Sequence, residues 1–432
     1  MILRDPIHGL VSFESEEELV APRLIDTPEV QRLRRVRQLG VTSFAFPGAE
    51  HTRFAHAVGA AFVMKLLLAR LRAIHGSLPY WQQITSDRAR DVIAAALLHD
   101  VGHGPLSHLF EDAIPGVPMH EEWTRRIVLD ESTTVHRVLA AEDAAMPGRV
   151  AALVSGKHPL PYLARSVSGT FDVDRCDYLL RDAHATGVRY GVFDLDWLLR
   201  SLCFAPAQSP NEAPSLAVDG AKGLPAIEAF LVARLFMFQQ VYLHKATRSA
   251  EWMIRAILSR AARLVGGGAR LEGTPRALEL AAHGEDIPLG DYLELDDAAL
   301  GCAMHEWEEC KDDGLRDLTR RVRVRSLFKT YELFGEQASA RGREQALATA
   351  RDIARTQGLD PDVYVGLDVA SDVPFESEEE PLVVYAKGPA RPLSEVSFLL
   401  SRLRGETLER VRLVFAPELR DAITNAMSDA PH

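Results

Sequence analysis

The sequence predicts a mainly α-helical protein with a short β element at the N-terminus and a small α/β region at the C-terminus. Apolar residues recur at helical spacing through much of residues 28–262. Residues 1–20 are punctuated by Pro6 and Gly9, as in a short strand or hairpin. After about residue 330 the helical texture gives way to valine-rich runs typical of strands. We therefore divide the chain into a helical core, 1–330, and an α/β region, 331–432.

The individual helices follow from start signals and apolar periodicity. Asp26-Thr27-Pro28 is a typical helix start and predicts a helix over 28–39, which ends at Gly40. Residues 88–100 are apolar almost all round, which is typical of a buried helix, and Pro105 predicts the start of the next one. Further helices are predicted over 52–74, 121–130, 134–142, 148–155, 173–184, 194–202 and 224–262.

The remaining elements lie in a loop and in the C-terminal region. Residues 205–223 are rich in Pro, Ala, Ser and Gly and predict a loop or weak hairpin. In the C-terminal region, strands are predicted over 363–369, 382–385 and 412–415, and helices over 341–357 and 417–427. Strands that alternate with helices favour a small α/β unit beside the helical core.

Composition narrows the class of protein. The chain is 47% hydrophobic and 25% charged, which is an ordinary globular balance. It has no uninterrupted run of 18 apolar residues and no apolar leader, so we expect a cytoplasmic protein with no membrane partner. The net charge of −12 opposes general nucleic-acid binding, which needs a basic surface. The four cysteines form no Cys-x-x-Cys pair and are expected to be free thiols.

Histidines concentrate in the N-terminal half, where 11 of the 15 lie before residue 185. His56 shares a helix face with Arg53, three residues earlier. The adjacent His99 and Asp100 end the buried helix, and a later helix carries Asp174. Imidazoles and carboxylates on apolar helices are costly unless they are paired or bind a metal.

The mixed nitrogen and oxygen ligands predict one divalent transition metal ion, namely Zn, Fe, Mn or Co, and favour Mg less. Such an ion would activate water for hydrolysis. On the later helix, Asp174, Tyr178 and Asp182 are four residues apart and share a face.

Together these motifs resemble the HD-domain phosphohydrolase superfamily, and within it the deoxynucleoside triphosphate triphosphohydrolases. The order His, His-Asp, Asp is carried by His56, His99-Asp100 and Asp174. The strings that match the family are Asp5-Pro6-Ile7-His8-Gly9, Gln38-Leu39-Gly40, Phe46-Pro47-Gly48, His51-Thr52-Arg53-Phe54, Val101-Gly102-His103-Gly104-Pro105, Ser107-His108 and Asp177-Tyr178. The resemblance is dense over residues 1–200 and implies an HD-domain helical core.

The resemblance also implies roles for single residues. The implied metal ligands are His56, His99, Asp100 and Asp174. The implied catalytic residues are His103, His108, Glu111 and His120, with Glu111 standing where the family usually has Asp. The implied substrate contacts are Gln38, Leu39, Arg53, Arg175, Tyr178, Asp182, Arg234 and Tyr242. The implied reaction releases a deoxynucleoside and inorganic triphosphate from a dNTP, with Mg accompanying the triphosphate.

Regulation by a nucleotide is a further implication of the resemblance. Asp26 and Arg34 match residues that hold a guanine nucleotide between subunits of the vertebrate enzymes. We therefore hypothesise activation by dGTP or GTP and assembly into a homo-oligomer, a dimer or a tetramer. The arginines of this segment also fit a solvated helix face, and that interpretation stays open.

Two other functions remain open at this point. One is an HD phosphohydrolase that acts on nucleoside monophosphates or on a guanosine alarmone. The alarmone enzymes have a Glu-Asp pair shortly after His-Asp, whereas Val101-Gly102-His103-Gly104 follows here. The other is a nucleotide-sensing regulator, which the full set of metal ligands disfavours.

Overall fold

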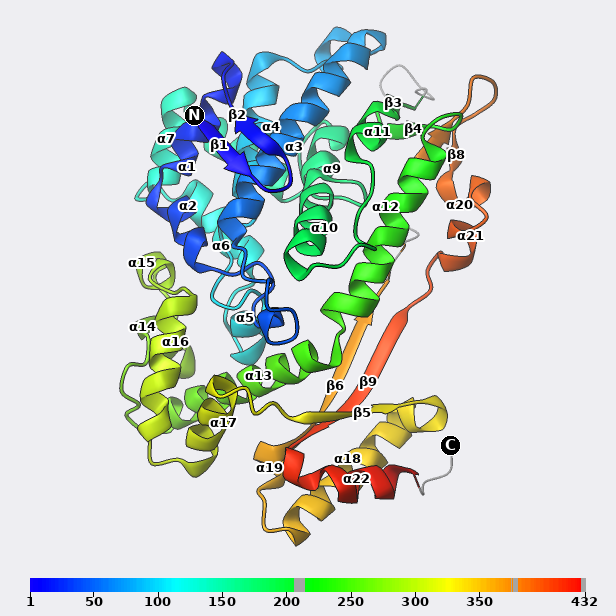
Figure 1. The fold of residues 1–432 in the computed structure, drawn as a ribbon. Coiled ribbons are helices and arrows are strands. Elements are labelled where there is room, and N and C mark those ends of the chain that lie inside the picture. The colour runs from blue at the N-terminus through cyan, green and yellow to red at the C-terminus, as the bar shows by residue number, and fades with distance from the viewer. Residues whose placement is uncertain (206–213, 374, 376–379, 429–432) are drawn as a thin grey trace.

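A mainly helical body with an N-terminal β-hairpin and small sheets nearer the C-terminus forms the protein, as the sequence predicts (Figure 1). The computed structural model describes residues 1–205, 214–373, 375 and 380–428. The hairpin consists of β1 (Ile2–Asp5) and β2 (Gly9–Ser12), which pair in antiparallel register from Ile2 opposite Ser12 to Asp5 opposite Gly9.

The N-terminal body packs around two long apolar helices. α3 (Arg53–Ile74) and α4 (Ser86–Leu98) lie against each other, and α10 (Val173–Thr186) packs on α3. The Thr85 side chain caps α4 by accepting a hydrogen bond from the backbone nitrogen of Arg88. The other helices of this body are α1 (Val20–Ile25), α2 (Pro28–Arg32), α5 (Leu109–Ala113), α6 (His120–Leu129), α7 (Thr134–Glu142), α8 (Met146–Val154), α9 (Pro161–Val167) and α11 (Leu195–Arg200).

Three predicted helices differ from the structure. The helix predicted over 28–39 begins at Pro28, but α2 ends at Arg32 and a 3-10 turn follows, because Arg37 pairs with Thr52 in a β-bridge. Pro105 does not start a helix, because Leu106 and Ser107 have left-handed backbones with φ of 55° and 59°. The helix predicted over 224–262 is broken into α12 (Leu224–Met237), a π-helical turn at Phe238–Tyr242, and α13 (Lys245–Gly266).

A second core surrounds α13 and includes four helices that the periodicity did not reveal. These are α14 (Arg276–Ala282), α15 (Leu289–Leu293), α16 (Asp297–Glu306) and α17 (Asp313–Arg323). The adjoining sheet has the order β5-β9-β6 and is antiparallel, with β5 (Lys329–Leu333), β6 (Val365–Asp372) and β9 (Leu408–Phe415). Helices α18 (Ala340–Thr356) and α22 (Arg420–Ser428) lie near it (Figure 1).

The predicted strand at 363–369 starts later, since Pro361–Tyr364 forms the short helix α19 before β6. A second sheet has the order β3-β4-β7-β8, with β3 (Leu202–Phe204), β4 (Leu216–Asp219), β7 (Leu382–Val384) and β8 (Arg391–Pro392). β3 and β4 pair antiparallel, and β4 lies within the segment 205–223 predicted as a loop or weak hairpin, of which residues 206–213 lie outside the described residues. Short helices α20 (Leu393–Val396) and α21 (Leu400–Leu403) follow.

One helical segment, Leu224–Tyr242, is long and apolar enough to cross a membrane by length and composition. Its mean hydropathy is 1.3, and 44% of the window is buried inside the protein. Glu228 and Arg234 interrupt its apolar sequence. Core helices of soluble proteins have the same properties, so this segment is weak evidence for a membrane span.

Candidate active site

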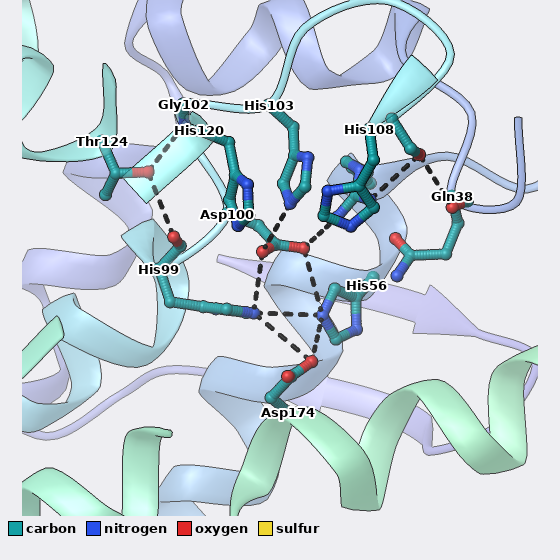
Figure 2. Close-up of polar contacts among 12 residues, drawn as sticks. Gln38, His56, His99, Asp100, Gly102, His103, His108, His120, Thr124 and Asp174 are labelled. Carbon is teal, nitrogen blue, oxygen red and sulfur yellow. Dashed lines mark hydrogen bonds and ion pairs between the residues drawn. The ribbon is translucent and has the colours of Figure 1, made fainter. Parts of the chain in front are cut away.

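Two histidines and a carboxylate from three helices converge on one point (Figure 2). His56 lies in the first turn of α3, His99 is the C-terminal cap of α4, and Asp174 lies in the first turn of α10. Nε2 of His56 is 3.3 Å from Nε2 of His99 and 3.0 Å from Oδ1 of Asp174. Asp100 borders the same point, with its carboxylate oxygens 3.7 Å from Nε2 of His56 and 3.5 Å from Nε2 of His99.

The Nδ1 atoms of His56 and His99 point away from the cluster, and their hydrogen bonds indicate that the cluster suits a cation. Nδ1 of His56 lies 2.8 Å from Oδ2 of Asp177, and Nδ1 of His99 lies 2.9 Å from the carbonyl oxygen of Ala96. Carboxylate and carbonyl oxygens only accept hydrogen bonds, so both Nδ1 atoms carry the proton. The two Nε2 atoms therefore face each other at 3.3 Å, where a proton or a metal ion offsets the repulsion between their lone pairs. Metal-binding histidines typically have this tautomer and this outer partner.

The electrostatics of the cluster agree with this interpretation. Burial lowers the pKa of His56, but Asp174 and Asp177 raise it more strongly, to about 10. Burial raises the pKa of Asp100, but His99 and Arg53 hold it well below its usual value. The carboxylates therefore stay ionised and favour positive charge at the imidazoles, and a divalent metal ion supplies that charge.

Three further histidines form a second cluster beside Asp100 (Figure 2). The rings of His103 and His120 stack with centroids 3.8 Å apart, and the ring of His108 is 4.9 Å from each. Oε1 of Glu111 accepts hydrogen bonds from Nδ1 of His108, at 2.7 Å, and from Nδ1 of His120, at 3.2 Å. The four residues implied to be catalytic therefore lie together, with Glu111 orienting two of the imidazoles.

The two clusters are joined through His103, whose Nε2 is 3.3 Å from Oδ1 of Asp100. Burial and the Arg53 guanidinium hold the pKa of His103 well below its usual value, so this ring is neutral. The left-handed turn at Leu106 and Ser107 precedes His108, and Oγ of Ser107 lies 3.0 Å from Nη2 of Arg53. Strained backbone of this kind is typical of functional sites.

A cavity of about 620 Å³ opens beside these clusters. Of the residues implied to contact substrate, it is lined by Gln38, Leu39, Arg53, Tyr178, Asp182 and Tyr242, together with the catalytic candidate His108. Asp182 is fixed by two hydrogen bonds of 2.7 Å, which it accepts from the Tyr242 hydroxyl and from Nε2 of His51. Tyr178 and Asp182 therefore share a helix face toward the cavity, as their spacing predicts.

Other predicted residues do not line this cavity. Arg175 pairs with Asp172 at 3.1 Å, and Arg234 pairs with Asp372 at 3.0 Å. Asp26 and Arg34 are exposed and also lie outside the cavity lining, and the guanidinium of Arg34 stacks 3.6 Å from the centroid of the Phe54 ring.

Sequence reasoning missed the far wall of the cavity, which α13 and β6 provide. The lining residues there are Arg248, Glu251, Arg255, Val369, Ala370 and Ser371. Arg248, Glu251 and Arg255 recur at intervals of three and four residues, so they share one helix face. These three charged residues on one face of the helix were the pattern from which the sequence could have predicted this wall. β6 carried no signal beyond its strand pattern.

Models of two protein families match this chain. Residues 53–181 match the model of the HD domain, and residues 193–266 and 274–430 match that of the HD associated region. The uncharacterized protein YwfO of Bacillus subtilis is 33% identical over 97% of this chain and 92% of its own length. The deoxynucleoside triphosphate triphosphohydrolase SAMHD1 of Gallus gallus is 28% identical over 60% of this chain, which spans 45% of that protein.

Among solved structures, a phosphohydrolase from Bacteroides thetaiotaomicron superposes with a TM-score of 0.80 and 28% identity. The match covers 96% of this chain and 99% of that one. Both matched regions and the near full-length similarity to YwfO lead to one assignment. The chain belongs to the HD-domain phosphohydrolases that carry an HD associated region.

Proposed function

We propose that this HD-domain phosphohydrolase hydrolyses deoxynucleoside triphosphates to a deoxynucleoside and inorganic triphosphate. The observation that carries the proposal is that His103 connects the two histidine clusters beside one cavity. Gln38, Leu39, Arg53 and Tyr242 line that cavity. Polar groups of two kinds, for phosphate and for sugar, therefore border one reaction centre. The similarity to the SAMHD1 triphosphohydrolases supports the same substrate class.

The metal would be held by His56, His99, Asp100 and Asp174, and we propose Zn, Fe, Mn or Co from these ligands. Such an ion supplies Lewis acidity, which polarises phosphoryl oxygens and activates water. Mg would accompany the triphosphate of the substrate. Side chains of the protein would bind the substrate and transfer protons.

Arg53 is the residue best suited to hold phosphate. Its guanidinium is buried, contacts Asp100 and lies at the junction of the metal ligands and the cavity. An arginine there can donate two parallel hydrogen bonds to phosphoryl oxygens. Nε of Arg53 has no hydrogen-bond partner among the described residues, so one donor stays available.

His108 is the residue best suited to protonate the leaving oxygen. Its Nδ1 donates to Glu111, which leaves Nε2 for the substrate, and 54% of its side chain is exposed toward the cavity. On the sugar side, the buried Oε1 of Gln38 has no partner among the described residues and can accept from a sugar hydroxyl.

The decisive experiment loads metal-free protein with Mn²⁺, Fe²⁺, Co²⁺ or Zn²⁺ and offers each dNTP, NTP and dNMP, and a guanosine alarmone, in the presence of Mg²⁺. Ion-exchange chromatography should show inorganic triphosphate from dNTPs. Turnover of monophosphates or of an alarmone alone, or no turnover, would refute the proposal. Asp174→Ala should lose both bound metal and turnover, and retained activity would mean that Asp174 is not a ligand.

We also propose that dGTP or GTP activates a cytoplasmic homo-oligomer, a dimer or a tetramer, through Asp26 and Arg34. Both residues are exposed and lie away from the cavity lining, as a second nucleotide site between subunits requires. Analytical ultracentrifugation and rate measurements with and without dGTP test this idea. A mass and a rate that dGTP leaves unchanged would contradict it.

A further inference from the structure

The N-terminal hairpin reaches the rear of the metal cluster through a single carboxylate. Nε2 of His8, in the turn between β1 and β2, lies 2.7 Å from Oδ1 of Asp177. The other oxygen of Asp177, Oδ2, accepts the hydrogen bond from Nδ1 of His56. Two hydrogen bonds therefore connect a hairpin residue to a metal-ligand candidate that lies 48 positions later in the chain.

Arg181 provides a second connection between the same parts. Its Nε and Nη2 atoms each donate to Asp177 at 2.8 Å, and its Nη1 donates to Oδ2 of Asp5 at 2.8 Å. The other oxygen of Asp5 accepts from the backbone nitrogens of Ile7, at 2.9 Å, and His8, at 3.0 Å. Asp5 therefore both binds Arg181 and shapes the turn that presents His8.

These groups are fully enclosed. The side chains of Asp177 and His56 are 0% exposed, and that of Arg181 is 2% exposed. A carboxylate has about four acceptor sites, and the four hydrogen bonds from His8, His56 and Arg181 fill those of Asp177. Loss of any one of these donors removes a hydrogen bond that orients this buried carboxylate. Each donor is therefore needed to hold the orientation of this carboxylate.

We propose that Asp5 and His8 are positioning residues for the metal centre, which they act on through Asp177 and Arg181. A carboxylate that accepts from the Nδ1–H of a ligand histidine fixes the tautomer and the ring orientation and raises ligand basicity. Metal affinity and docking of the hairpin are consequently coupled, and the coupling is reciprocal. The inference rests on the metal centre and not on which nucleotide is the substrate.

Metal affinity without nucleotide is the first test. Equilibrium dialysis of the full chain with Mn²⁺, Co²⁺ and Zn²⁺ should give a Kd for His8→Ala about 3- to 10-fold above wild type, the effect of one hydrogen bond. Asp177→Asn should raise Kd about 10- to 100-fold. His8→Gln keeps a donor and should restore most of the affinity. A wild-type Kd for His8→Ala would overturn the proposal.

Lys65→Met is the matched control. Lys65 also fastens the hairpin to α3, since its Nζ donates to the carbonyl oxygen of Ser12 at 2.7 Å and pairs with Glu18 at 3.0 Å. No contact joins it to Asp177, so its loss should lower the stability of the hairpin, and metal Kd should stay near the wild-type value as long as the hairpin remains docked. An equal rise in Kd for Lys65→Met and His8→Ala would show a merely structural role and overturn the proposal.

Hydrogen exchange of residues 2–12 supplies a readout independent of affinity. Metal should slow exchange there in wild type and in Lys65→Met, but much less in Asp5→Asn or His8→Ala. If His8→Ala does not fold, Asp5→Asn alone is compared with wild type and with Lys65→Met, and His8→Gln should behave as wild type. Exchange that is insensitive to metal in wild type would contradict the coupling. None of these measurements uses a nucleotide, so a failure of the proposed dNTP hydrolysis would be distinguished from a failure of this inference.

Discussion

Substituting Gly59 by alanine tests the tight approach of α3 and α10 behind the metal centre. A Cβ atom at Gly59 would lie 2.0 Å from Oδ1 of Asp177 and 2.3 Å from Nη2 of Arg181. Both atoms belong to the enclosed ion pair, which has no room to move aside. The methyl group therefore forces either the two helices apart or the ion pair to break.

The expected magnitude follows from opposing effects. Helix propensity alone favours alanine over glycine by about 1 kcal/mol. Overpacking a dense core costs about 1–3 kcal/mol, and disrupting a buried ion pair costs about 3–5 kcal/mol. If the Asp177–Arg181 pair breaks, Gly59→Ala should lower the free energy of unfolding by about 2–4 kcal/mol. Metal affinity should fall with it, because Asp177 orients His56.

Urea unfolding followed by circular dichroism, together with equilibrium dialysis of metal, measures both effects. Gly301→Ala is the matched control, because Gly301 lies inside α16 and no atom is within 4 Å of a Cβ added there. It should be stabilising by about 1 kcal/mol. If Gly59→Ala proves as stable as Gly301→Ala and binds metal normally, the reasoning about this close approach is wrong.

Three other perturbations have defined outcomes. Burial raises the pKa of Glu111 but His108 and His120 lower it below 4.5 overall. As the pH falls below 4.5, Glu111 therefore takes up a proton in the unfolded chain before it does so in the folded protein, and the free energy of unfolding falls. Glu111→Gln removes this group, so the melting temperature of the variant should depend less on pH in that range. Under the proposed function, Arg53→Lys should lower kcat/KM for dNTPs about 10- to 100-fold, since lysine lacks the planar fork. Arg248→Ala removes the nearest of three arginines that pair with fully buried Asp368, the others being Arg255 and Arg412, and should cost about 1.5–3 kcal/mol in urea unfolding. Loss of exposed Arg276 should cost less than about 1 kcal/mol.

The helical body was predictable where local pattern and burial agree. α3 and α4 were found because their apolar residues lie in long runs, and the predicted and observed bounds differ by no more than two residues. The grouping of His56, His99 and Asp174 was also predictable, because polar groups on buried helices need partners. The pattern could not show that Asp177 and Arg181 would support them, since both also fit a solvated helix face.

Long-range contacts explain what the sequence could not show. α2 ends early because Arg37 pairs with Thr52, which is 15 residues away, and the break between α12 and α13 is a π-helical turn with no proline or glycine to mark it. Local periodicity carries no information about such pairings. The same limit hid the contribution of β6 to the cavity, because its partner Arg248 lies 120 residues earlier.

That contribution changes how the C-terminal region must be understood. Arg248 pairs with Asp368 in the middle of β6, and Arg234 pairs with Asp372 at its C-terminal end, so two ion pairs fasten the strand to α13 and α12. Between them, Val369, Ala370 and Ser371 line the cavity. Removing residues 331–432 would take away both carboxylates and the part of the cavity wall that β6 provides. The region that the sequence presents as an appendage therefore forms part of the cavity beside the candidate active site.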